Sequence, residues 1–302
     1  MSLVAGIDGG QSSTIAVIGD ERGRILARGA AGPSDEVGAT ADSTRLRDAL
    51  AAALADARRR ANLPDESIFD AIVAGVSGYD GRVYGRAPQL ASTRVVLMHD
   101  TPIAHAGALG GQAGVVVISG TGSVVYARAE DGTSRTLGGW GFLFGDEGSA
   151  FSIASHALAA LLRADDEDDS SLAGERDAAY EFFGMRSLRG IVHAFYKGAI
   201  TRSRLASFAP TAMRFDVFRT LANQGADRLV ALVSRAIDDG APPRVALVGG
   251  VFADAGFRER VRGGILAAVP EAEVVEPCYD PACGALLLGY RELGFNISEL
   301  HP

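Results

Sequence analysis

The feature that most constrains the fold of this chain is an internal repeat of one strand pattern. Residues 3–28 contain three apolar runs separated by glycine-containing turns, and residues 115–137 repeat the same order of runs and turns. Short apolar runs bounded by glycine and charged residues predict strands, and tight turns between them predict antiparallel hairpins. Because the same unit occurs twice within 302 residues, we expect two similar sheets.

Further elements are expected after the first copy. Apolar residues recur at helical spacing over residues 42–61, and Asp42 or Ser43 can cap the start of this helix. Residues 72–76 and 95–98 are apolar runs that predict strands buried on both faces. These strands are expected to extend the first sheet in parallel.

The second copy is followed by a longer helical region. We expect a helix at residues 149–162, more helical sequence to residue 235 and a buried strand at residues 244–248. The acidic run 165–169 is expected to be a solvated loop, because like charges repel and stay hydrated.

Charge and composition exclude several classes of function. With 29 basic and 37 acidic residues, the chain has no excess of positive charge with which to bind nucleic acid. Cys278 and Cys283 are too few for a disulfide framework or a four-thiolate metal site. No stretch resembles a signal peptide or is apolar enough to span a membrane, which predicts a cytoplasmic protein without a membrane partner.

The turn between the first two strands can bind phosphate. Its glycines let the backbone approach an anion, and its hydroxyl and N–H groups can donate hydrogen bonds to phosphate oxygens. A carboxylate facing the same phosphate requires a cation between them, so Asp8 is a candidate Mg²⁺ ligand. A plain glycine hairpin turn explains the same residues equally well. The residues concerned are Asp8, Gly9, Gly10, Ser12 and Ser13.

The corresponding turn of the second copy offers the same donors without a carboxylate, through Gly120, Thr121, Gly122 and Ser123. It is not a P-loop, which needs a lysine after its glycines, nor a dinucleotide-binding fingerprint, whose glycines open a helix. The two turns together predict a site for ATP phosphates.

Asp100 follows the strand expected at residues 95–98. At the carboxyl end of a parallel strand it could accept the proton of a substrate hydroxyl, and phosphoryl transfer needs a base of ordinary basicity that is well positioned. The alternative is a helix N-cap, because Pro102 stands at an early helical position.

Residues 138–149 form a glycine-rich run that neither helix nor strand periodicity explains. Trp140 could present its ring to a sugar face, and Asp146 and Glu147 could accept hydrogen bonds from sugar hydroxyls. The alternative is a glycine-rich turn with a core tryptophan and a helix cap. Further on, Gly249 and Gly250 would let a nucleoside rest against bare backbone.

Taken together, these motifs resemble the BadF/BadG/BcrA/BcrD ATPase family, in particular its N-acetylglucosamine kinase branch, over nearly the whole chain. The resemblance rests on residues 6–10 and 119–123 as phosphate segments, on 138–141 with 145–149, and on 247–251 as the adenosine segment. It implies an α/β, two-lobed actin/hexokinase-like (ribonuclease H-like) ATPase fold with a duplicated βββαβαβα core.

The resemblance also implies residue roles. Ser12 and Thr121 would contact ATP phosphates, Gly250 and Asp254 the nucleoside, Asp8 the Mg²⁺, and Asp100 would be the catalytic base. The sugar would contact Gly139, Trp140, Asp146 and the loop 32–38. In that loop Asp35 stands where the kinases have an asparagine, and Val37 replaces an aromatic residue of the animal enzymes.

The implied function is transfer of the ATP γ-phosphoryl group to the 6-hydroxyl of an amino sugar, with N-acetylglucosamine favoured. Glucosamine is a close second substrate, because Asp35 could pair with its ammonium group. Residues 1–109 and 287–302 would form one lobe and residues 110–286 the other, in a homodimer.

The first alternative is a family ATPase that energises a partner enzyme, but no cluster-binding arrangement surrounds the cysteines. A sugar-sensing regulator would require a DNA-binding helix-turn-helix module, for which we find no sequence.

Overall fold

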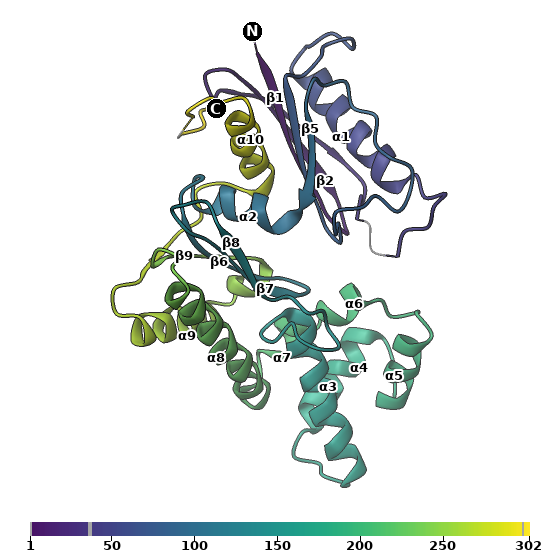
Figure 1. The fold of residues 1–302 in the computed structure, drawn as a ribbon. Coiled ribbons are helices and arrows are strands. Elements are labelled where there is room, and N and C mark those ends of the chain that lie inside the picture. Colours follow the sequence, from purple (N-terminus) through teal and green to yellow (C-terminus); the bar gives the residue numbers. More distant parts are fainter. Residues whose placement is uncertain (1, 36–37, 298) are drawn as a thin grey trace. The chain divides into compact units, whose positions relative to one another are not determined.

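The computed structural model describes residues 2–35, 38–297 and 299–302 (Figure 1). Two compact units divide the chain. The first comprises Met1–Gln112 and Glu276–Pro302, and the second comprises Ala113–Val275. The chain therefore leaves the first unit and returns to it at the C-terminus.

The first unit contains a five-stranded sheet in the order β3-β2-β1-β4-β5. β1 and β2, and β2 and β3, are antiparallel, whereas β4 pairs parallel with both β1 and β5. The strands are β1 (Leu3–Gly9), β2 (Thr14–Asp20), β3 (Ile25–Ala31), β4 (Ala71–Val76) and β5 (Val95–His99).

Helices cover both faces of this sheet. Successive residues of a strand point to opposite faces, so Ile72 packs in one apolar cluster with α1 (Arg45–Arg60), whereas Val73 packs on the other face. That other face is covered by α2 (Asp100–Ala108) and α10 (Pro281–Glu292).

The second unit repeats this sheet. Its order is β10-β9-β6-β7-β8; β6 and β7, and β7 and β8, are antiparallel, whereas β9 pairs parallel with both β6 and β10. The predicted internal repeat is therefore confirmed. The strands are β6 (Gly114–Ser119), β7 (Ser123–Arg128), β8 (Ser134–Gly138), β9 (Arg244–Val248) and β10 (Glu273–Val275).

One face of the second sheet packs against α8 (Asp216–Asp238) and α9 (Ala255–Ala268). A separate apolar core joins the helices inserted between β8 and α8. They are α3 (Ala150–Asp166), α4 (Ala173–Phe183), α5 (Leu188–Tyr196), α6 (Arg202–Ala206) and α7 (Ala209–Ala212). A 3₁₀ turn, η1 (Gly250–Ala253), connects β9 to α9.

Several local predictions are wrong. β5 is not buried on both faces, because it is the edge strand and Val95 is 41% exposed. The first long helix begins after Thr44, so neither Asp42 nor Ser43 occupies its N-cap position, although the Ser43 hydroxyl accepts a hydrogen bond from the Arg45 N–H at 3.4 Å. α3 continues to Asp166 and includes the start of the acidic run. Residues 77–94 connect β4 to β5 without a helix.

None of the helices in the described part of the chain combines the length and hydropathy needed to cross a membrane.

Candidate active site

The β1–β2 turn leaves its hydroxyl groups at the surface. Gly9 ends β1, and the backbone N–H of Gly10 closes the turn by donating to the Ser13 carbonyl at 2.9 Å. Ser12 and Ser13 are exposed at its tip. The predicted phosphate donors of the first unit are therefore accessible to a ligand.

Three carboxylates act on one another near this turn. Asp8 lies in β1, Asp100 begins α2, and Asp280 precedes α10. Burial raises the pKa of Asp8 to about 7, and the negative charges of Asp100 and Asp280 add to the effect. A divalent cation beside Asp8 would favour its ionised form, because the positive charge offsets both the burial and the repulsion.

Asp280 was missed by the sequence analysis. Its carboxylate accepts a hydrogen bond from the Cys283 N–H at 2.9 Å and so caps α10. The available signal was an aspartate directly before Pro281, a favoured combination at a helix start.

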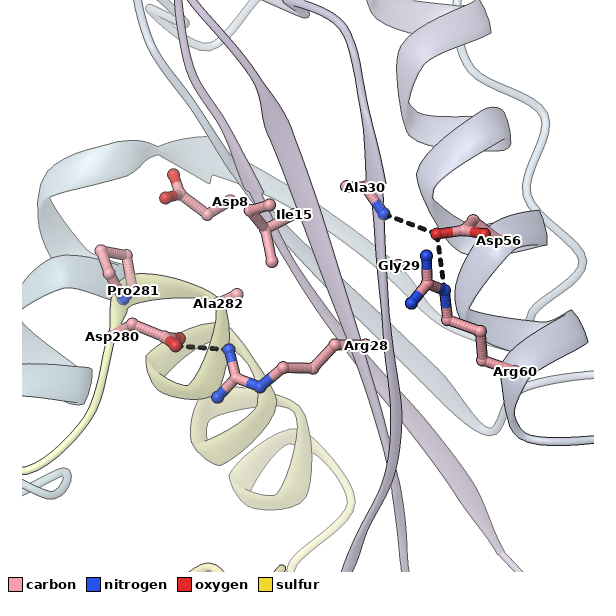
Figure 2. A pocket seen from close by; sticks show the side chains of 10 residues that line it. All are labelled: Asp8, Ile15, Arg28, Gly29, Ala30, Asp56, Arg60, Asp280, Pro281 and Ala282. Carbon is pink, nitrogen blue, oxygen red and sulfur yellow. Dashed lines mark hydrogen bonds and ion pairs between the residues drawn. The ribbon is translucent and has the colours of Figure 1, made fainter.

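A cavity of about 320 Å³ lies beside Asp8 (Figure 2). Arg28 of β3 reaches across it and pairs with Asp280, while Asp56 of α1 pairs with Arg60. Arg28 thus compensates part of the charge that acts on Asp8.

The residues present fit a Mg²⁺ ion that is bound partly through a nucleotide. Within the described ranges, no three His, Cys, Asp or Glu side chains are placed to hold a metal together. Mg²⁺ keeps several waters and needs one or two carboxylates in addition to substrate phosphates. Asp8, whose ionised form is disfavoured by burial and by the charges of its neighbours, is the candidate carboxylate for that role.

Asp100 is not the N-cap of α2. The cap is His99, whose Nδ1 accepts a hydrogen bond from the Thr101 N–H at 3.3 Å. Asp100 is the first helical residue instead, and its carboxylate is about one-third exposed. The capping alternative is therefore wrong, and the carboxylate is accessible to a substrate hydroxyl.

Asp35 is buried and faces a positive charge. Its Oδ1 lies 3.6 Å from Nη2 of Arg45, at the start of α1. Val37, the other predicted difference in this loop, lies outside the described residues.

In the second unit, the β6–β7 turn is attached to the start of α3. The Ala150 N–H donates to the Gly120 carbonyl at 2.9 Å, and the Ser123 hydroxyl donates to the Glu147 carbonyl at 2.8 Å. Ser123 is thus engaged with the protein, whereas Thr121 lines a cavity.

That cavity, of about 630 Å³, brings together the second phosphate turn and the predicted nucleoside segment. Gly120, Thr121, Gly250 and Asp254 all line it, and its size is that of a small-molecule site. The other wall of the cavity, formed by α6, α7 and residues beside them, was not predicted, because nothing in the sequence marks these helices as site-forming. That wall includes Ser203, Ala206, Ser207, Ala209, Pro210 and Met213.

Gly249 and Asp254 hold this segment in place. Gly249 has φ +115°, and a Cβ there would collide with the Ser119 carbonyl at the end of β6. Asp254 caps α9 by accepting from the Phe257 N–H at 2.8 Å, and it pairs with Arg219 at 2.9 Å.

The glycine-rich loop exposes its apolar side chains and buries an acid. Trp140 is 75% exposed, so the core tryptophan alternative is wrong. Gly139 precedes it with φ +69°, and Glu147 is exposed. Asp146, at φ +59°, is buried and pairs with Nη2 of Arg202 at 2.8 Å. Sequence reasoning missed Arg202.

These units define an α/β protein of the actin/hexokinase-like class, as predicted. The chain belongs to the BadF/BadG/BcrA/BcrD ATPase family, whose model matches residues 5–289. The family resemblance is thereby confirmed.

Individual relatives are kinases by name. An N-acetylmuramic acid/N-acetylglucosamine kinase of Clostridium acetobutylicum is 29% identical over 226 residues, which cover 68% of each protein. The crystal structure of a provisionally assigned N-acetylglucosamine kinase from Chromobacterium violaceum matches with a TM-score of 0.76 and 28% identity. It covers 95% of this chain and 99% of that one. A second, from Porphyromonas gingivalis, shares the fold at 18% identity and a TM-score of 0.69, covering 97% of this chain and 99% of that one.

Proposed function

We propose that the protein transfers the γ-phosphoryl group of ATP to an amino sugar, and that its preferred substrate is N-acetylglucosamine, phosphorylated at the 6-hydroxyl. The observation that carries the proposal is the cavity of the second unit, where the Gly120–Thr121 turn meets Gly250 and Asp254. ATP needs hydrogen-bond donors for its phosphates and a surface for its nucleoside, and this cavity has a candidate for each. The kinase names of the relatives support the sugar as acceptor.

Asp100 is proposed to accept the proton of the attacking hydroxyl. Its accessible carboxylate at the first turn of α2 is suited to this role, because a loose phosphoryl-transfer transition state needs positioning more than strong basicity. Asp8 would hold the Mg²⁺, which neutralises phosphate charge when bound. The backbone N–H groups and the hydroxyl of the Gly120–Thr121 turn would orient the phosphates.

The environment of Asp35 favours a neutral sugar over glucosamine. The positive charge of Arg45, 3.6 Å away, opposes the attraction that Asp35 would otherwise exert on an ammonium group. Asp35 can still accept a hydrogen bond from a neutral sugar hydroxyl or amide. The exposed ring of Trp140 would cover an apolar sugar face.

Cys283 argues against a role in energising a redox partner through a shared metal cluster. Burial raises the pKa of Cys283 to about 11, and its sulfur accepts a hydrogen bond from Arg28 at 2.9 Å. Cys283 is also buried, whereas a cluster shared with a partner protein needs accessible thiolates.

A competition experiment tests the substrate. The protein is incubated with ATP, Mg²⁺ and equal concentrations of N-acetylglucosamine, glucosamine and glucose, and the sugar phosphates are quantified by mass spectrometry. We expect mainly N-acetylglucosamine phosphate, with a 6-phosphate signal by NMR. Predominant glucosamine phosphate would contradict the argument from Asp35 and Arg45.

A further inference from the structure

Arg202 contacts the glycine-rich loop from outside every recognised motif. It begins α6, and its Nη2 donates a hydrogen bond to Asp146 Oδ2 at 2.8 Å. Its guanidinium also lies over the rings of Phe142 and Phe151, 5.1 and 5.9 Å from their centroids. A planar cation that is stacked on rings and bonded to a carboxylate is held in one orientation.

The same ion pair packs against the second phosphate turn. A Cβ on Gly122 would lie 2.8 Å from Asp146 Oδ2 and 2.9 Å from Arg202 Nη2. The backbone N–H groups of Ser123 and Gly141 also donate to the Asp146 carboxylate. Asp146 therefore joins the turn, the glycine-rich loop and α6.

The negative charge of Asp146 and the positive charge of Arg202 stabilise each other. Burial raises the pKa of Asp146, the charge of Arg202 is the largest influence that lowers it, and the neighbouring charge of Glu147 raises it further. Nε of Arg202 is buried and has no hydrogen-bond partner among the residues with described positions. Without the arginine, Asp146 would be a buried carboxylate without a counter-charge, and such groups become protonated more readily.

We propose that Arg202 is a positioning residue of the active site, which acts through Asp146 to hold the phosphate turn and the glycine-rich loop in the substrate-binding arrangement. The inference rests on the proposed kinase function. It assigns Arg202 no contact with ATP or sugar, and it gives a positioning role to α6, whose Ser203 and Ala206 line the cavity.

The test measures kcat/KM for N-acetylglucosamine as a function of pH in Arg202→Met and Arg202→Lys. Arg204→Met is the matched control, because Arg204 lies on the same helix but stacks on Phe182 at 4.1 Å. In Arg202→Met we expect the acidic limb of the profile to move up by about one pH unit, a loss of about tenfold at low pH that recovers at high pH. Lysine should largely restore the wild-type limb, and Arg204→Met should follow the wild type.

A second comparison separates positioning from folding. If Arg202 acts only through Asp146, it has nothing left to position once Asp146 is replaced. Adding Arg202→Met to Asp146→Asn should therefore change kcat/KM by less than about twofold, which is too small to indicate a separate role of Arg202. An Arg202→Met profile that is parallel to the wild type at every pH would overturn the inference, as would full additivity with Asp146→Asn.

An inactive wild type would count against the proposed function instead. The inference is then decided by calorimetric ADP affinity. Weaker binding to Arg202→Met than to Arg204→Met would support it, and equal binding would overturn it.

Discussion

Nδ1 of His99 lies 2.8 Å from Oδ1 of Asp100 and 3.3 Å from the backbone nitrogen of Thr101. One ring nitrogen cannot donate to the carboxylate and accept from the N–H group at once. The protonation of His99 therefore determines which of the two neighbours it binds.

His99→Asn should change the stability of the protein in a pH-dependent way, because it removes the positive charge of protonated His99. The hydrogen bond to Asp100 raises the pKa of His99, so its stabilising effect is fully present below the unfolded value of 6.5 and is lost as pH rises through the higher folded value. Asparagine can keep the N-cap but carries no charge. The wild type should melt at a higher temperature than the variant at pH 5.5, and the gap should narrow by pH 8.5. A constant gap would contradict the assignment.

Asp8→Asn should stabilise the protein when no Mg²⁺ is present. Because the folded pKa of Asp8 is raised to about 7, its ionisation costs stability as pH rises from its unfolded value near 3.8 through 7. At pH 8 without Mg²⁺ we expect the variant to melt about 3 °C higher.

The same variant should lose the further stabilisation that Mg²⁺ with ATP gives the wild type. Differential scanning fluorimetry measures the melting temperatures of the wild type and Asp8→Asn, with and without Mg²⁺ and ATP. Equal stabilisation of the two proteins by Mg²⁺ and ATP would exclude Asp8 from the metal site.

The strand repeat was predictable because strands and tight turns are recognised from residues that are adjacent in sequence, here apolar runs and glycines. The position of Asp100 was likewise predictable, since it follows its strand directly. Arg202 was not, because it lies 56 residues from Asp146 in sequence and meets it only through the packing of α6. The exposure of β5 was also missed, since a strand's place at the sheet edge depends on pairing that its own sequence does not record.

Trp140→Ala should weaken sugar binding with little effect on stability, because the ring is exposed. Loss of a stacking surface should raise KM for the sugar about tenfold, with a much smaller effect on KM for ATP. Phe144→Ala is the control in the same loop, since Phe144 is 84% exposed and has no predicted sugar contact. Equal effects of the two substitutions would remove the special role of Trp140.

Gly249→Ala should damage the nucleoside segment. The left-handed φ of +115° and the contact with the Ser119 carbonyl leave no room for a Cβ, so we expect a loss of about 2–3 kcal/mol of unfolding free energy and weaker ADP binding. Gly263→Ala is the matched control at an exposed position of α9, where a Cβ meets nothing within 4 Å and should stabilise by about 0.5–1 kcal/mol. Chemical denaturation measures both; a neutral Gly249→Ala would contradict the close approach of β6 and β9.

In the proposed reaction, ATP turnover requires both a sugar and the Asp100 carboxylate. The direct measurement is ADP release by wild type and Asp100→Asn with ATP and Mg²⁺, in the presence and absence of N-acetylglucosamine. We predict strong stimulation by the sugar in the wild type and a loss of about 10²–10⁴-fold in the variant, with ADP affinity retained. Turnover by the wild type that is the same with and without each amino sugar would contradict the kinase function and favour an ATPase that acts on a partner.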